Sequence, residues 1–88
     1  MINNITQGTK CVLYIATEHS DIQKTSGIFE KFLSIGEDLA MVIVLDESHK
    51  ELQGKMRIIM VNAISAIDII DLKEEVKKSE EDKATYFT

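Results

Sequence analysis

Short apolar runs separated by polar segments form the main pattern of this chain. The clearest runs lie at residues 10–17, 39–45 and 56–61. They are short and rich in β-branched residues, which favours strands over helices. Polar segments at 18–24 and 46–55 are typical of loops, and Gly36-Glu37-Asp38 predicts a turn. The pattern therefore predicts a mainly β protein with short connections.

Two segments fit more than one kind of element. The apolar positions of residues 25–35 suit a helical face or a strand, and Gly27 favours a strand with a bend. Residues 62–71 fit either a helix capped by Asn62 that continues to residue 83, or a corner at 62–65 and a strand at 66–71. The many isoleucines, and the alternation in Ile67-Asp68-Ile69, favour the strand.

The length and cysteine content indicate one small domain without covalent staples. The chain has 88 residues, no proline and one cysteine, Cys11, which rules out an intrachain disulfide and a cysteine-based zinc site. Small domains of this kind often gain stability by oligomerising. We expect a folded domain over residues 1–72, followed by a charged and partly helical tail over 73–88 with Leu72 and Val76 as its apolar anchors.

The charge is unfavourable for general nucleic-acid binding. The net charge is −5, and residues 1–72 hold ten acids against six lysines and arginines. A nucleic-acid binder needs a basic surface to displace phosphate counterions. The longest apolar run, residues 39–45, is too short to span a membrane, and no signal peptide is evident. We therefore expect a cytoplasmic protein with no membrane partner.

Candidate catalytic groups are few. Cys11 lies in a predicted strand, where a buried apolar thiol is more common than a reactive one. His19-Ser20-Asp21 has the residue types of a hydrolytic triad, but adjacent loop residues seldom reach its geometry. The acids and His49 of residues 46–51 lack the spacing of a calcium loop and a second zinc-binding histidine. We expect no enzymatic activity, no cofactor and no bound metal.

Three aromatic residues offer a further choice between core packing and base stacking. Alternate faces of bent strands normally place rings such as Phe29 and Phe32 in the core, and we expect the same of Tyr14.

Taken as five strands, the chain resembles the Sm/LSm family of small barrels. A small-residue pair in the second strand, Ser26-Gly27, is followed by Ile28-Phe29. An apolar third strand then runs into acids over residues 39–47, and residues 58–69 contain two apolar strands around a tight corner. The resemblance covers residues 10–71.

The resemblance implies a strongly bent, five-stranded antiparallel sheet closed into a small barrel. It also implies a closed ring of identical subunits, which we expect to number about five to eight. In such a ring the fourth strand of one subunit pairs with the fifth strand of the next. The predicted edge residues are Ile58, Ile59, Met60, Val61, Ile67 and Ile69.

The resemblance also suggests loop positions for RNA binding, namely Ser34, Asp38 and Asn62. Family members that bind uridine-rich RNA carry an asparagine in the first of these loops and a basic residue in the later turn. Here residues 33–38 contain no asparagine and residues 61–63 contain no basic residue. RNA therefore remains only a weakly supported partner.

Three hypotheses for function follow. The leading one is an Sm-like ring-forming protein with an RNA-associated role. The second is a protein-interaction scaffold that has the barrel fold and does not bind RNA. The third is a small α+β regulatory protein with a helix at residues 62–83, which a high helix content would reveal.

Overall fold

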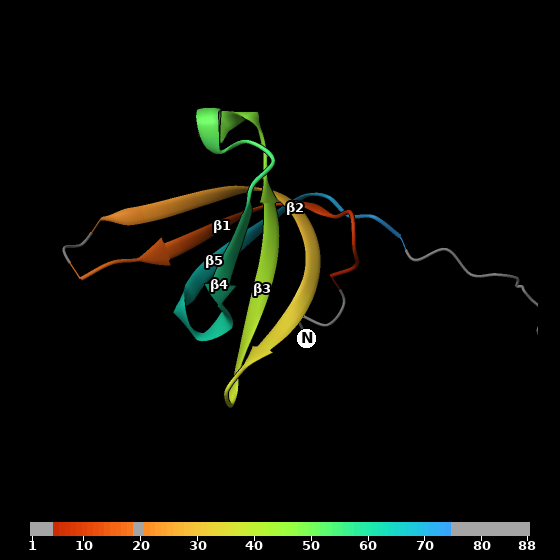
Figure 1. Cartoon of the computed structure of the whole chain (residues 1–88). Helices are drawn as coiled ribbons and strands as arrows, with labels where there is room; N and C mark the ends of the chain where they lie inside the picture. The colour runs from red at the N-terminus through yellow and green to blue at the C-terminus, as the bar shows by residue number, and fades with distance from the viewer. Residues whose placement is uncertain (1–4, 19–20, 75–88) are drawn as a thin grey trace, which may run out of the picture.

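Five β-strands and two short 3₁₀ helices make up the computed structural model, which describes residues 5–18 and 21–74 (Figure 1). The strands are β1 (Lys10–Ala16), β2 (Ile22–Ile35), β3 (Asp38–Leu45), β4 (Met56–Met60) and β5 (Ile64–Asp71). Helix η2 (Glu47–Leu52) joins β3 to β4, and η3 (Val61–Ala63) joins β4 to β5. The predicted five strands are confirmed, and a helix across residues 62–71 is wrong.

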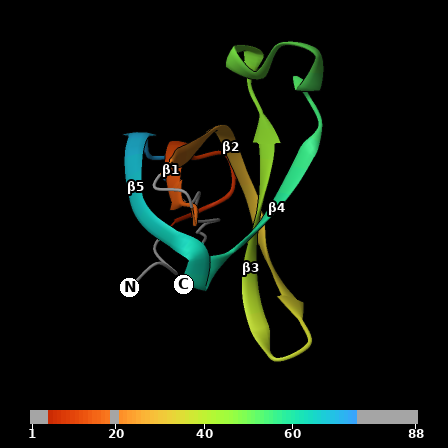
Figure 2. The same cartoon turned by 90° about the vertical axis from the view of Figure 1, so that its left-hand side faces the viewer.

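The strands form one antiparallel sheet in the order β4-β3-β2-β1-β5. Strands β4 and β5 follow one another in sequence, yet they lie at opposite edges of this sheet (Figure 2). In the described residues β4 pairs only with β3, and β5 pairs only with β1. The prediction of a closed barrel is therefore wrong. Closure fails because the short strand β4 ends at η3, which turns the chain onto the far side of β1.

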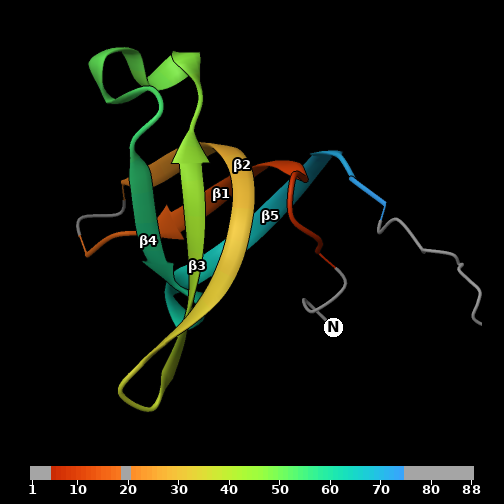
Figure 3. The same ribbon diagram turned by 45° about the vertical axis from the view of Figure 1, so that its right-hand side comes forward.

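Strand β2 carries the bend that gives the sheet its shape (Figure 3). Its first half pairs with β1 and its second half pairs with β3, and Gly27 belongs to both pairings. A Cβ atom on Gly27 would lie 2.2 Å from the carbonyl oxygen of Val44. Only glycine permits this close approach of two backbones. The strand with a bend that the sequence favours is thus confirmed.

The beginning of β2 differs from the prediction. Residues 22–24 were expected in a polar loop, but Gln23 and Lys24 pair with Ile15 and Tyr14 of β1. Their polarity reflects an exposed position at the end of a hairpin that extends past the rest of the sheet (Figure 1).

The core lies on the inner, concave side of the bent sheet. Its buried residues are Cys11, Leu13, Phe29, Met41, Ile43, Leu45 and Ile59. Phe29 is buried in the core, as predicted, and the partly buried Phe32 packs against it, with 4.9 Å between the ring centroids. Cys11 is fully buried, as predicted, and this burial raises the pKa of its thiol to about 11.

Strand β3 is buried on both faces, because Ala40 and Val42 on its outer face are also covered. This explains its uninterrupted apolar sequence. Among the residues that the structure describes, no helix is long and apolar enough to cross a bilayer. The predicted tail lies outside the described residues from 75 onward, and with it Val76.

Candidate functional site

Large exposed apolar side chains gather on the two edge strands. On β4, Met56 and Ile58 are 66% and 52% exposed. On β5, Ile69 and Ile70 are exposed, and Leu72 follows directly after the strand. An edge strand also has backbone N–H and C=O groups on its free side, so these edges offer both unpaired polar groups and apolar contact area.

The alternation of side chains separates the two faces of β4. Ile59 lies opposite the buried Met41 and is itself buried in the core. Met56 and Ile58 therefore point to the outer face. The predicted edge residues are thus divided, because Ile58 is available for contact whereas Ile59 stabilises the fold.

The remaining predicted edge residues are also divided. Ile69 is exposed on β5, whereas Ile67 is half-buried and packs against the core. Met60 ends β4, and Val61 begins η3 instead of continuing the strand as predicted. The list of predicted edge residues omitted Met56, Ile70 and Leu72. Met56 could have been found by extending along β4 the alternation that exposes Ile58.

The two edges carry opposite charge. Lys55 and Arg57 lie immediately before and within β4, while Asp68 and Asp71 lie within β5. Arg57 is half-buried, and its Nη1 donates a hydrogen bond of 2.8 Å to the hydroxyl of buried Thr25. In the described part of the chain, the only ion pair joins Lys10 to Asp46, so Arg57 has no carboxylate partner there.

Asp68 is held by a neighbouring strand. The Tyr14 hydroxyl donates a 2.8 Å hydrogen bond to its carboxylate, and this bond, aided by desolvation and by the negative charge, raises the pKa of Tyr14. The Tyr14 ring therefore lies on the outer face over β5 and not in the core, which corrects the prediction. Tyrosine alternates with buried Leu13, so its outward position follows from the strand geometry.

The predicted RNA-binding positions lie at two separate connections of the chain, Ser34 and Asp38 beside the β2–β3 turn and Asn62 in η3. Ser34 pairs with Leu39 and Asp38 pairs with Ile35, so both are strand residues beside a turn made only of Gly36 and Glu37. The prediction that Ser34 and Asp38 lie in a loop is wrong, because the hairpin pairs up to its last two residues. Asn62 lies in η3, at the predicted corner. No side-chain hydrogen bond connects Asn62 to either residue in the described segments.

A polar cluster holds η2 against β2. The Asp46 carboxylate accepts hydrogen bonds from the Ser26 hydroxyl at 2.5 Å and from the backbone N–H and hydroxyl of Ser48. The Ser26 N–H donates to His49 Nε2 at 2.9 Å, and its carbonyl accepts from the Asp46 N–H. Burial alone would raise the pKa of Asp46, but these hydrogen bonds and the Lys10 ammonium outweigh it and lower the pKa to about 2.

This cluster contains serine, histidine and aspartate, yet its bonding is structural. The Ser26 hydroxyl donates to the carboxylate, while His49 accepts from the Ser26 backbone. A hydrolytic arrangement requires the imidazole to receive the hydroxyl proton. We assign the cluster to the positioning of η2, and we name it the Ser26 clasp, comprising Ser26, Asp46, Ser48 and His49.

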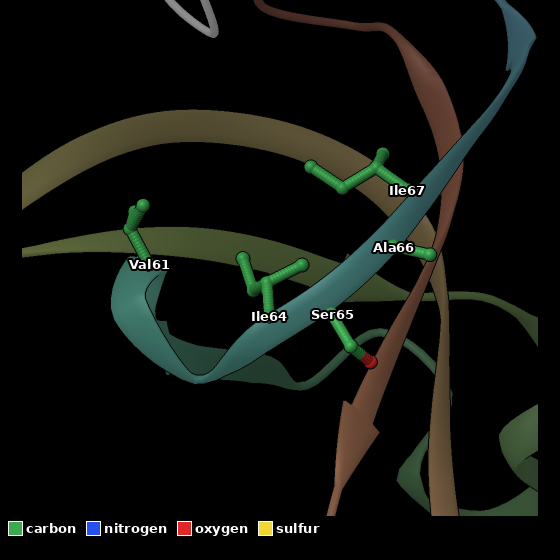
Figure 4. Close-up of a pocket in the computed structure, with 5 residues that line it drawn as sticks. All are labelled: Val61, Ile64, Ser65, Ala66 and Ile67. Atoms are coloured by element: carbon green, nitrogen blue, oxygen red, sulfur yellow. The ribbon is translucent and has the colours of Figure 1, made fainter.

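A cavity of about 230 Å³ lies where η3 passes into β5 and is lined by Val61, Ile64, Ser65, Ala66 and Ile67. Val61, Ile64 and Ile67 point to one side of the ribbon, whereas Ser65 points toward β1 (Figure 4). The Ser65 hydroxyl donates to the carbonyl of Tyr14. The cavity therefore offers apolar contact area beside the β5 edge, without the convergent polar groups of a small-molecule site.

The remaining candidate groups include residues that the structure does not describe. His19 and Ser20 lie outside the described residues, and the Asp21 carbonyl closes a turn by accepting from the N–H and hydroxyl of Thr17. Within residues 5–18 and 21–74, no three histidine, cysteine or acidic side chains are arranged to hold a metal ion. Comparison with protein-family models, curated proteins and solved structures finds no match to this chain.

Proposed function

We propose that this chain is an Sm-like, ring-forming subunit and that its ring acts as a scaffold for protein partners. The proposal is based on the two edge strands, β4 and β5, which lie at opposite ends of one bent sheet. Both carry exposed apolar side chains, and neither has a paired strand on its outer side among the described residues. The resemblance of residues 10–71 to the Sm/LSm family supports the same assembly.

The two free edges are different surfaces, so self-association through them is head-to-tail. Strand β4 of one copy pairs with β5 of the next copy, which leaves β5 of the first copy and β4 of the second copy free for further contacts. Such heterologous contacts give a ring when the rotation between copies closes. The pairing satisfies backbone groups on both edges and covers Met56, Ile58 and Ile70, which are exposed in one copy.

The charge and the hairpin geometry favour a protein partner over RNA. The chain has a net charge of −5, and the strand β2–β3 turn consists of only two residues, flanked by Asp38. Phosphate binding needs clustered cations, which these positions lack. An RNA-associated ring is the competing outcome of the experiment below.

Native mass spectrometry of the purified chain tests the proposal. We expect a single closed species of about five to eight subunits. Substituting Ile58→Lys places a charge on the β4 edge and is expected to yield monomers. Ile22→Lys is the matched control, because Ile22 is 65% exposed on β2, away from both edge strands, and this variant should assemble normally.

Two results would change the conclusion. A wild-type protein that remains monomeric at high micromolar concentration contradicts ring formation. A ring that gains the mass of an added oligouridine would instead support the RNA-associated role, whereas a ring that ignores the oligonucleotide supports the scaffold.

A further inference from the structure

We infer that η2 is a pH-sensitive flap, which the neutral His49 ring holds against β2 and which is released when that ring takes up a proton. The inference concerns a single subunit and does not depend on ring formation. It combines a single attachment between η2 and β2, an acceptor that only a neutral imidazole provides, and a strained backbone at Lys50.

The His49 ring is the attachment of η2 to β2. Its Nε2 accepts a 2.9 Å hydrogen bond from the Ser26 N–H, and among the described residues no other hydrogen bond joins η2 to β2. The bonds between Asp46 and Ser26 lie before the helix begins. Helix η2 contains no buried residue, so apolar packing contributes little to holding it in place.

Only the neutral imidazole can make this bond. Because Nε2 accepts, the ring carries its single proton on Nδ1. A proton added to Nε2 would turn the acceptor into a donor that faces the Ser26 N–H. The bond is therefore present at higher pH and is lost as the pH falls from about 7 to about 5, the range in which histidine side chains ordinarily take up a proton.

The other charged side chains that flank the clasp keep their charge in this range. Carboxylates ordinarily take up protons only below about pH 5, and lysines lose theirs only above about pH 9. The pKa of Asp46 is lowered to about 2, so its carboxylate stays ionised and continues to bind Ser26. The flanking groups are Lys10 on β1, Lys24 on β2, and Asp46, Glu47, Lys50 and Glu51 at the end of β3 and along η2.

The backbone at Lys50 favours release. Lys50 has a φ of 59° and a ψ of −118°, and it is the only residue other than glycine with a positive φ in the described part of the chain. A residue with a Cβ atom is strained in this conformation, which glycine adopts freely. Since Lys50 directly follows His49, the bond from His49 to Ser26 holds this kink in place, and loss of the bond allows Lys50 to relax.

The base of the flap stays fixed. The Leu45 N–H donates to the Lys55 carbonyl at 2.9 Å, and the Gly54 N–H donates to the Leu45 carbonyl at 2.8 Å. These bonds close the connection between β3 and β4 independently of His49. Release therefore moves η2, leaves the sheet intact, and frees the Ser26 N–H at the point where β3 no longer pairs with β2.

Amide hydrogen exchange at Ser26, followed by NMR in the full chain, tests the inference. Protection is expressed relative to the intrinsic exchange rate at each pH, so that only structural opening is compared. From about pH 7 to about pH 5, protection of the Ser26 N–H should fall about tenfold, the change expected for the loss of one hydrogen bond. Protection of the Leu45 N–H at the base should stay constant. Unchanged protection at Ser26, or an equal loss at Leu45, overturns the inference.

Variants of the two histidines assign the response. His49→Gln supplies an amide oxygen that accepts without titrating, so Ser26 should show the same protection at both pH values. His49→Ala removes the acceptor and should leave Ser26 weakly protected at both. His19→Gln, the same substitution at the other histidine of the chain, is the matched control and should retain the wild-type response. A response that persists in His49→Gln or disappears in His19→Gln would contradict the role of His49.

Two substitutions of Lys50 test the strain. Lys50→Gly and Lys50→Ala remove the same charge, but alanine keeps a Cβ atom at the position with positive φ. The glycine variant should therefore lose protection at Ser26 at a lower pH than the alanine variant. Loss at the same pH in both variants would show that the backbone at Lys50 does not drive the release.

Discussion

The Ser26 clasp and the two edge strands differ in whether their backbone N–H and C=O groups have hydrogen-bond partners. Beyond Leu45, β3 no longer pairs with β2, and the clasp takes over: the Ser26 N–H and carbonyl find partners in His49 and Asp46. On β4 and β5, the outer edges have no such cover in the described residues. The backbone groups of one region are paired within the chain, whereas the outer edges of the other region have no paired strand among the described residues.

This difference separates two kinds of residue. Substitutions at the clasp and at the neighbouring crossing of β2 and β3 should change the free energy of unfolding of a single subunit. Substitutions on the outer faces of the edge strands should change association and leave that free energy nearly constant. The predictions below test the separation, beginning with the largest expected effect.

Gly27→Ala should destabilise the subunit by more than about 4 kcal/mol, an exceptional effect for one methyl group. The new Cβ would lie 2.2 Å from the Val44 carbonyl oxygen, so β2 and β3 would have to separate at the bend. Denaturant unfolding followed by circular dichroism measures the change. Gly36→Ala is the control, since its Cβ meets no atom within 4 Å and only its φ of +62° opposes alanine, at about 1 kcal/mol. Equal losses in the two variants would show that the close approach is unimportant.

Ile59→Ala and Ile58→Ala compare two neighbouring residues on opposite faces of β4. Ile59 is 5% exposed in the core, and its truncation should lower the free energy of unfolding by about 3 kcal/mol through lost burial and a cavity. Ile58 is 52% exposed, and its truncation should lower it by less than about 1 kcal/mol. Unfolding is best measured at concentrations below assembly, where association adds nothing. A large loss of unfolding free energy for Ile58→Ala in the monomer would contradict the distinction between exposed edge residues and core residues.

The bend and the strands were accessible from sequence because their causes are local. Short β-branched runs and their alternation predict strands, and Gly27 between Ser26 and Ile28 indicates the bend. The corner at η3 also follows from local composition. The lack of barrel closure does not, because it depends on how few residues β4 contributes before the chain turns.

The Ser26 clasp could not be predicted in the same way. Ser26 and Asp46 are 20 residues apart in sequence, and only the ending of β3 beside the bend brings them together. The acids and the histidine of η2 indicated a polar segment, but nothing in the sequence indicated that they bond to Ser26. Similarly, the charge difference between the edges is visible in the sequence, whereas the half-burial of Arg57 depends on its reach to Thr25 across the inner face.

Asp46→Asn should lower the free energy of unfolding by about 2 kcal/mol near neutral pH, the scale expected for hydrogen bonds to a charged group. The carboxylate accepts from the Ser26 and Ser48 hydroxyls, and the amide that replaces it turns one acceptor into a donor. Ser48→Ala removes only one of the three hydrogen bonds that the carboxylate accepts and should have a smaller effect. If Asp46→Asn is as stable as the wild type, the backbone hydrogen bonds of Ser26 alone would account for the stabilising effect of the clasp.

The same group predicts the acid response of the subunit. The pKa of Asp46 falls from an ordinary value of 3.8 to about 2 in the folded chain. Because the folded value is the lower one, the stabilisation is complete above about pH 4 and is lost as the pH falls from 3.8 toward 2. Unfolding measured across this window should converge for the wild type and Asp46→Asn at its acid end. Curves that stay parallel down to pH 2 would mean that the charge of Asp46 does not stabilise the clasp.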